Sequence, residues 1–311
     1  MKFTIAVHGG AGTILKENMT PELEKKYTQG LQQALNAGYS VLQKGGSAMD
    51  AVIEAVVVLE DDILFNAGRG SVFTKNGSHE MDAAVMSGAD LAAGAVCGVQ
   101  HIRNPVNLAA AVMRKTDHVI LSGQGAADFA REQGFVFETN EYFFSQFRYD
   151  QWLDIRGSDT YQLDHSTQNS ITDKKFGTVG AVACDIHGNI AAATSTGGMT
   201  NKNYGRIGDT PLIGCGTYAN NKTCAVSCTG HGELFIKAVA AYDVSCLMEY
   251  ANMNLHDAMN KVVNEKLVAI KGEGGIIGVD AKGNFAMQFN SEGMYRGVKT
   301  SEGLNEVSIY R

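Results

Sequence analysis

The sequence predicts an α+β fold built from two antiparallel sheets that pack face to face and are covered by helices. Three observations support this prediction. Short apolar runs follow one another in adjacent sets separated by turn residues, as antiparallel strands do. The helical segments come in pairs. The sequence lacks the regular alternation of strand and helix that would favour a doubly wound parallel sheet.

The first 133 residues predict strands interleaved with helices. Residues 3–7 are apolar and predict a buried strand. A helix begins at Thr20-Pro21, where a capping hydroxyl precedes a proline, and a glycine pair at 45 and 46 ends it. A second helix follows over 47–58. Further strands are expected at 71–74, 79–86, 92–100 and 118–122, and further helices at 105–115 and 124–133.

Residues 139–175 are polar, with scattered aromatic residues and no clear period. They predict a long stretch without regular structure, which is unusual inside a domain and often functional. Beyond it, two apolar strands joined by a short turn predict a hairpin over 179–185 and 190–196. The remaining expected elements are strands at 223–229, 275–280, 285–290 and 294–299, and helices at 232–250 and 255–270.

The composition is ordinary for a globular protein, with 44% apolar and 19% charged residues among 311. We expect a single domain over 1–311. The net charge of −7 gives no basic surface, so nucleic acid is not an expected partner. Without a secretory leader or a long apolar run in the sequence, we expect a cytoplasmic protein with no membrane partner. We interpret the six cysteines as reduced core thiols.

The most informative segment is Gly177-Thr178-Val179-Gly180. A threonine hydroxyl is a weak nucleophile that needs a nearby base. A threonine at the start of a chain carries its own base, an α-amine with an ordinary pKa of about 7.7–8.0. Thr178 reaches that state only if the bond before it is cut. Taken alone, the segment also fits an ordinary strand start flanked by glycine.

Two further segments place polar groups near Thr178. Thr196 ends the second strand of the predicted hairpin, about as far from the turn as Thr178, so the two should lie close together. Arg206 and Asp209 lie three residues apart in a glycine-rich loop. Such a pair can hold the α-carboxylate and α-ammonium of an amino acid, although a lone pair at this spacing is also typical of a surface ion pair.

The last two segments are 227–233 and 65–70. The first joins a strand to a helix, so hydroxyls and free amide groups become available to an oxyanion. It also fits an ordinary turn at a strand end. In the second, Asn66 either takes part in the site or caps a turn.

In this order and spacing, the five segments resemble the plant-type asparaginases, or isoaspartyl peptidases, which are N-terminal-nucleophile hydrolases. The resemblance covers nearly the whole chain and includes His8-Gly9-Gly10-Ala11-Gly12 and Glu80-Met81-Asp82-Ala83. It implies a four-layer αββα sandwich. It also implies self-cleavage into an α chain, 1–177, with a flexible tail over about 139–177, and a β chain, 178–311. The mature unit would be a homodimer of such αβ pairs.

The resemblance also implies an activity and a role for each site residue. The enzyme would hydrolyse L-asparagine and cleave isoaspartyl dipeptides without an organic cofactor. Thr178 would be the nucleophile and, through its freed amine, the base, while Thr196 would orient its hydroxyl. Thr229 and Gly230 would form the oxyanion hole. Arg206 would bind the substrate α-carboxylate, and Asp209 its α-ammonium. Gly232 would add a backbone carbonyl, and Asn66 would help hold the mature amine.

A structural sodium ion is a further implication of the resemblance. Main-chain carbonyls of one loop would surround it, from Leu59, Glu60, Asp62, Phe65, Ala67 and Arg69. Two alternatives stay open at this point. One is a related glycosylasparaginase, which usually has Asp before the threonine and a secretory or lysosomal location. The other is a precursor that stays uncut and inactive.

Overall fold

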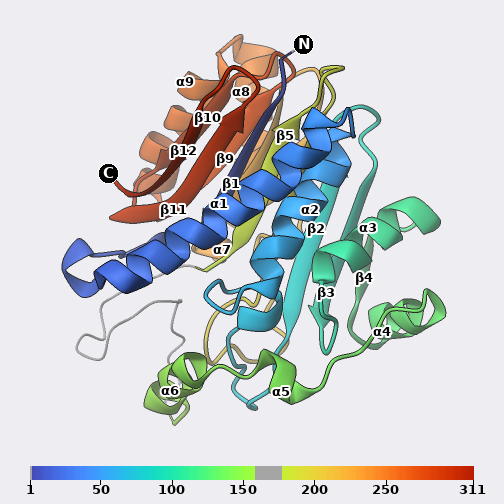
Figure 1. Cartoon of the computed structure of the whole chain (residues 1–311), viewed down its shortest axis with the longest axis vertical. Helices are drawn as coiled ribbons and strands as arrows, with labels where there is room; N and C mark the ends of the chain where they lie inside the picture. The colour runs from blue at the N-terminus through green and yellow to red at the C-terminus, as the bar shows by residue number, and fades with distance from the viewer. Residues whose placement is uncertain (1, 158–176) are drawn as a thin grey trace.

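Two sheets lie face to face between helices in the computed structural model, which describes residues 2–157 and 177–311 (Figure 1). The larger sheet has eight strands in the order β12-β11-β1-β5-β6-β2-β3-β4. Their bounds are β1 (Thr4–Gly12), β2 (Met81–Ser87), β3 (Ala93–Val99), β4 (Ile120–Ser122), β5 (Val179–Cys184), β6 (Ile190–Thr196), β11 (Gly293–Thr300) and β12 (Asn305–Tyr310). The smaller sheet has the order β10-β9-β8-β7, formed by β7 (Thr217–Ala219), β8 (Cys224–Gly230), β9 (Gly274–Asp280) and β10 (Phe285–Phe289).

The helices form the outer layers. The outer face of the larger sheet is covered by α1 (Pro21–Gln43), α2 (Ala48–Asp61) and α3 (Pro105–Lys115). The smaller sheet is covered by α8 (Ala240–Ala251), α9 (Leu255–Asn260) and a π-helix over Lys261–Leu267. The remaining helices are α4 (Gly123–Glu132), α5 (Asn140–Phe143), α6 (Gln146–Ile155), α7 (Gly232–Ala238) and the 3₁₀ turns Lys16–Asn18 and Gly68–Gly70. The predicted α+β sandwich is therefore confirmed.

Apolar alternation sorts the central strands between these layers. In β1, Ile5 and Val7 pack in the core beneath α1 and α2, while Ala6 belongs to the core shared with the smaller sheet. In β5, Val179 faces the helices and Val182 faces the smaller sheet. Because both faces are buried, these strands are apolar almost throughout. The same alternation turns the side chain of residue 178 toward the space between the sheets.

Sequence capping signals explain where the first two helices begin. Thr20 accepts a hydrogen bond from the amide of Leu23 at 3.2 Å, and Ser47 accepts one from the amide of Asp50 at 3.1 Å. Inside α1, Gly38 lies against Ile5 and the carbonyl of Ala51 without space for a β-carbon. This glycine therefore allows α1 to approach both the sheet and α2 closely.

The sequence predicted purely antiparallel sheets, and this prediction is wrong at one edge of the larger sheet. β4 runs parallel to β3, with Ala95 opposite Ile120. The reason is the connection: α3 lies between the two strands, and a helical crossover returns the chain in the same direction. The strand predicted over 71–74 was also wrong. The amide of Val72 donates to Asn66 Oδ1 at 3.0 Å instead of to a strand, and Thr74 forms only an isolated bridge.

Two more predictions need correction, and two strands were missed. The stretch 139–175 contains α5 and α6 in its first part, where the aromatic residues pack, as Phe73 does on Trp152 at 5.7 Å between ring centroids. Residues 158–176, which are part of the expected flexible tail, lie outside the described part of the chain. The helix expected over 232–250 is two helices separated by Val239 at φ +49°. The short β7 and the edge strand β12 were not predicted.

Candidate active site

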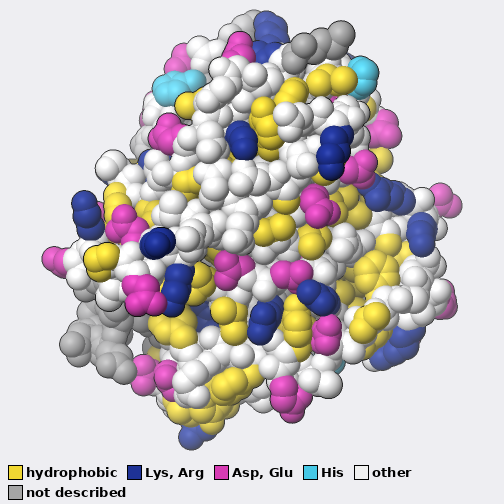
Figure 2. All heavy atoms as spheres, viewed as in Figure 1, with side chains coloured by type: hydrophobic (Ala, Val, Ile, Leu, Met, Phe, Trp, Pro, Cys, Tyr) yellow, Lys and Arg dark blue, Asp and Glu magenta, His cyan; other side chains and the backbone are white. Residues whose placement is uncertain are grey.

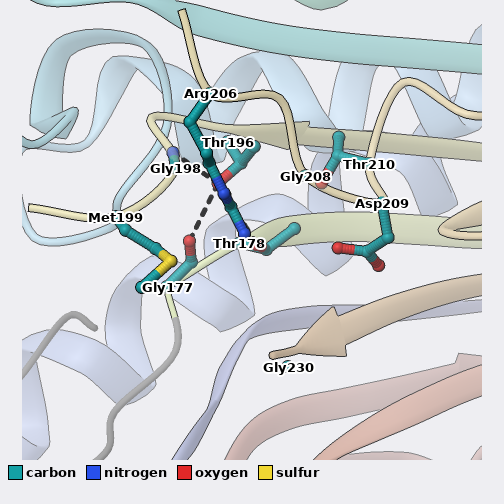
Figure 3. Close-up of a pocket in the computed structure, with 10 residues that line it drawn as sticks. All are labelled: Gly177, Thr178, Thr196, Gly198, Met199, Arg206, Gly208, Asp209, Thr210 and Gly230. Atoms are coloured by element: carbon teal, nitrogen blue, oxygen red, sulfur yellow. Dashed lines mark hydrogen bonds between the residues drawn. The ribbon is translucent and has the colours of Figure 1, made fainter. Parts of the chain in front are cut away.

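The β5–β6 hairpin brings the two central threonines together, as the sequence predicted. Val179 pairs with Ser195 and Gly180 with Thr194, so the same register places Thr178 opposite Thr196. The Thr178 hydroxyl donates to Thr196 Oγ1 at 3.2 Å. Both side chains are buried. Figure 3 shows them side by side at the wall of a small pocket.

The carbonyl of Gly177 accepts two hydrogen bonds. Asn66 Nδ2 donates to it at 3.0 Å. Thr196 Oγ1 also donates to it at 3.0 Å, as Figure 3 shows. Thr196 Oγ1 in turn accepts from the amide of Gly198 at 2.9 Å and from Thr178. Asn66 is fixed at both ends of its amide, because Nδ2 also donates to the carbonyl of Gly198 and Oδ1 accepts from the amide of Val72. The peptide bond before Thr178 therefore has a polarised carbonyl next to a hydroxyl.

Asp209 lies on the other side of the same pocket (Figure 3). It is buried, and its Oδ2 has no hydrogen-bond partner among the described residues. Burial raises the pKa of this carboxyl to about 7, although the nearby charge of Arg206 acts in the opposite direction. A buried carboxylate oxygen that lacks a donor is suited to receive a cationic group from a ligand.

Arg206 also lines the pocket and forms a two-bond ion pair with Glu233. Its Nε and Nη2 donate to the two carboxylate oxygens at 2.9 Å each. His231 Nε2 also contacts Glu233, at 3.2 Å. Burial opposes ionisation of Glu233, but hydrogen bonds from His231 and Arg206 outweigh it and lower its pKa. Sequence reasoning missed Glu233, because its partner Arg206 lies 27 residues away in the chain.

The strand-to-helix junction after β8 supplies the remaining predicted residues. Thr229 is fully buried, and its hydroxyl has no partner within the described chain. Gly230 lines the pocket. Gly232 begins α7, where an added β-carbon would lie 2.9 Å from both Arg206 Nη2 and Asp209 Oδ1. Only glycine leaves this wall of the pocket open at that position.

The predicted sodium ligands lie in one loop after α2. Leu59 and Glu60 are in the last turn of the helix, Asp62 ends it, and Phe65, Ala67 and Arg69 follow. Two glycines of the loop have no space for a side chain because carbonyl oxygens surround them. A β-carbon at Gly68 would lie 2.5 Å from the Glu60 carbonyl oxygen, and one at Gly70 would collide with that of Phe65. Carbonyl oxygens are ligands that a hard cation accepts.

Arg148 of α6 binds the same loop. Its guanidinium is fully buried and donates to the carbonyls of Gly70 at 3.1 Å and Leu64 at 3.2 Å. Burial lowers the pKa of Arg148 to about 10, so it stays charged at neutral pH. Neither carbonyl belongs to the predicted sodium set. No pattern in the sequence indicated this contact, because the residues of α6 were expected to lack regular structure.

Comparison with known proteins agrees with this geometry. The model of the family described as asparaginase matches residues 1–309. The chain is 51% identical to an isoaspartyl peptidase of Salmonella typhimurium, over 100% of this chain and 99% of that protein. It is 50% identical to one of Escherichia coli, over 100% and 97%. An isoaspartyl peptidase/L-asparaginase of Homo sapiens is 42% identical, over 93% and 91%. No helix in the described residues could span a membrane.

We predict that Asp209→Asn stabilises the ligand-free protein in a pH-dependent way. The folded state raises the pKa of Asp209 from 3.8 to about 7. The protonated carboxyl therefore favours the folded state. This contribution to the free energy of unfolding is complete below pH 3.8 and is lost as the pH rises through about 7. Asparagine does not titrate, so the variant should gain on the wild type with rising pH, to on the order of 5 °C in Tm by pH 8.5.

Thermal unfolding between pH 4.5 and 8.5 measures this difference. Asp128→Asn, which replaces an exposed carboxyl of α4, is the control and should show no such trend. A Tm difference between Asp209→Asn and wild type that stays constant across the pH range would contradict the proposed buried ionisation.

Proposed function

The chain belongs to the asparaginase family and is therefore a hydrolase, and we propose that it is a self-cleaving N-terminal-threonine amidohydrolase. Its substrates would be L-asparagine and isoaspartyl dipeptides, because its relatives are named isoaspartyl peptidases and L-asparaginases. One observation carries the proposal. The Gly177 carbonyl accepts two hydrogen bonds beside the Thr178 hydroxyl, in a pocket that also contains Arg206 and Asp209.

Self-cleavage would begin with attack of Thr178 Oγ on the carbonyl carbon of Gly177. Negative charge then develops on the carbonyl oxygen, where Asn66 Nδ2 and Thr196 Oγ1 already donate. The C–N bond breaks, the nitrogen takes the proton of the hydroxyl, and an ester joins Gly177 to Thr178. Water hydrolyses that ester. The products are a carboxylate on Gly177 and a free α-amine on Thr178.

In the mature enzyme, the freed amine of Thr178 would take the proton of its own hydroxyl. The oxygen would attack the side-chain amide carbon of asparagine, or the β-peptide carbonyl of an isoaspartyl dipeptide. Ammonia or an amino acid leaves with that proton, and water then hydrolyses the β-aspartyl ester. We assign the oxyanion hole to Thr229 and Gly230, a role that the unpartnered Thr229 hydroxyl supports.

Arg206 and Asp209 would recognise the free α-groups of the aspartyl unit. The Glu233 pair uses Nε and Nη2 of Arg206, so the Nη1 side of the guanidinium can receive a carboxylate. The unpartnered Oδ2 of Asp209 would receive the α-ammonium, with the carbonyl of Gly232 beside it. Since a cationic and an anionic group are both needed, an asparagine inside a peptide would not bind.

We further propose a structural sodium ion held by the carbonyls of Leu59, Glu60, Asp62, Phe65, Ala67 and Arg69. Carbonyl oxygens lie so close to Gly68 and Gly70 that neither position has room for a side chain, and this supports the proposal. The ion would hold the loop that carries Asn66. The proposal also includes a homodimer of αβ pairs and a cytoplasmic location. It includes no organic cofactor and no nucleic-acid partner.

We predict that the purified chain cuts itself between Gly177 and Thr178. A denaturing gel with N-terminal sequencing should give fragments 1–177 and 178–311, with no added protease. Thr178→Ala should remain one chain, because it lacks the attacking oxygen, and Thr178→Ser should still cut. Asn66→Ala should cut on the order of 10²–10³ times more slowly, since one donor to the oxyanion is lost. A new chain that starts elsewhere, or a permanently uncut wild type, would contradict the proposal.

We predict a clear order of substrates for the mature enzyme. β-Aspartyl-leucine and L-asparagine should both be hydrolysed. L-Glutamine should be poor, because one more methylene displaces its amide carbon from Thr178. A peptide with an internal asparagine should be inert. Comparing kcat/KM for the four decides the issue, and Arg206→Ala should lose activity on both good substrates. Efficient glutaminase activity would reject the substrate assignment while leaving the Thr178 mechanism intact.

We predict that sodium stabilises the protein. At equal ionic strength, Tm should be higher in sodium chloride than in choline chloride and should rise with sodium concentration, as binding to the folded state requires. Gly70→Ala adds a β-carbon against the Phe65 carbonyl oxygen, so this variant should lose the dependence of Tm on sodium. Gly125→Ala, with open space around its α-carbon, is the matched control and should keep it. Equal Tm in the two salts would exclude the sodium site.

A further inference from the structure

We propose that His8 positions the nucleophile by donating from its Nδ1–H to the carbonyl oxygen of Thr178, in the tautomer maintained by a buried chain of hydroxyl groups. The inference rests on the proposed function in one respect only, that Thr178 is the nucleophile. Because His8 contacts the backbone carbonyl of Thr178 and not its reacting oxygen, it is a positioning residue.

His8 lies in β1, opposite Gly180 of β5, and its ring is fully buried between the two sheets. Nδ1 is 3.1 Å from the Thr178 carbonyl oxygen, and Nε2 is 2.9 Å from Ser227 Oγ. Gly180 makes this arrangement possible. A β-carbon there would collide with both Ser227 Oγ and His8 Nε2.

From Ser227, hydroxyl contacts continue across the space between the sheets. Ser227 Oγ lies 2.7 Å from Thr194 Oγ1, which lies 2.7 Å from Thr217 Oγ1. Thr217 Oγ1 lies 3.0 Å from the carbonyl oxygen of Thr210. The chain therefore runs from the carbonyl of the nucleophile to the residue after Asp209, with a carbonyl oxygen at each end.

The number of protons limits how this chain can bond. Carbonyl oxygens only accept, so the five contacts from Thr178 to Thr210 need five protons. A neutral imidazole supplies one, and the three hydroxyls supply three, which leaves one contact without a proton. Burial lowers the pKa of His8 to about 3, so the ring stays neutral at physiological pH.

Any of the five contacts could be the one without a proton, which gives five arrangements. In four of them Nδ1–H donates to Thr178, and the contact without a proton lies farther along the chain. In the fifth, every donor points away from Thr178, and the lone pair of Nδ1 faces the Thr178 carbonyl oxygen at 3.1 Å. The geometry favours the four arrangements with Nδ1–H. A ring lone pair is fixed in the imidazole plane, whereas a hydroxyl can rotate between two acceptors.

This bond gains importance once the chain is cut. Thr178 then becomes a chain end, and its backbone is continuous only toward Val179. The carbonyl of Thr178 lies outside the backbone pairing of β1 with β5, which ends at His8 and Gly180. The Nδ1–H donor therefore fixes the orientation of the free terminal residue. An error of about 1 Å in a reacting group can cost on the order of 10²-fold in rate.

Two variants of equal charge separate the two ring nitrogens. The amide nitrogen of His8→Asn reaches the place of Nδ1, so it keeps the donor to Thr178. The amide of His8→Gln reaches the place of Nε2, so it keeps a partner for Ser227 and loses that donor. After self-cleavage is verified on a gel, His8→Asn should keep kcat within about fivefold of wild type. His8→Gln should lose on the order of 10²-fold in kcat.

KM for L-asparagine should change little in either variant, because Arg206 and Asp209 are untouched. Equal kcat values for the two variants at equal Tm would overturn the proposal. If either variant fails to fold, nitrogen-15 NMR of the wild-type imidazoles replaces the kinetics, with the His8 signal expected as the Nδ1–H tautomer. An Nε2–H tautomer would overturn the proposal. An inactive wild type would instead reject the proposed function, and the NMR result would still stand.

Discussion

The register of the β5–β6 hairpin determines where every group of the candidate site lies. Both faces of these strands are buried, one beneath α1 and α2 and the other against the smaller sheet. A slip of one residue would move Val179 and Ala181 into the wrong layer and turn Thr178 away from Thr196. Gly180, with no space for a side chain, adds a steric limit to the same register. The hydrophobic core thus fixes the site before any polar contact forms.

The polar groups around this hairpin fall into two kinds. The hydroxyls of Thr194, Ser227 and Thr217 bond to one another and to His8, which makes them part of the structure. Thr229 Oγ1 and Asp209 Oδ2 are equally buried but have no partner among the described residues. Leaving such atoms unpaired costs free energy of folding, on the order of 1–3 kcal/mol each. A folded chain tolerates that cost where a ligand completes the bonds. Asp209 lines the pocket, and Thr229 directly precedes Gly230, which also lines it.

The sequence predicted these features to different degrees, for physical reasons. The hairpin, the first two helices and the contact of Thr178 with Thr196 follow from local apolar patterns and capping residues. The parallel strand β4 depends on a crossover, and the break at Val239 depends on amides of α8 that bond to the carbonyls of Gly214 and Cys215. The contacts of Glu233 and Arg148 were not predicted, because both residues bind partners that lie far away in the sequence. Local pattern carries no information about such partners.

Arg148 bears on how the protein could tolerate loss of a backbone bond at its centre. On one side of Gly177, α6 is anchored by a buried guanidinium to two carbonyls of the loop that holds Asn66. Stacking of Trp152 on Phe73 adds a second anchor. On the other side, β5 is hydrogen-bonded between β1 and β6. Neither set of contacts runs through the Gly177–Thr178 bond, so breaking it would free a carboxylate and an amine without loosening Asn66, Thr196 or the strand that begins beyond Thr178.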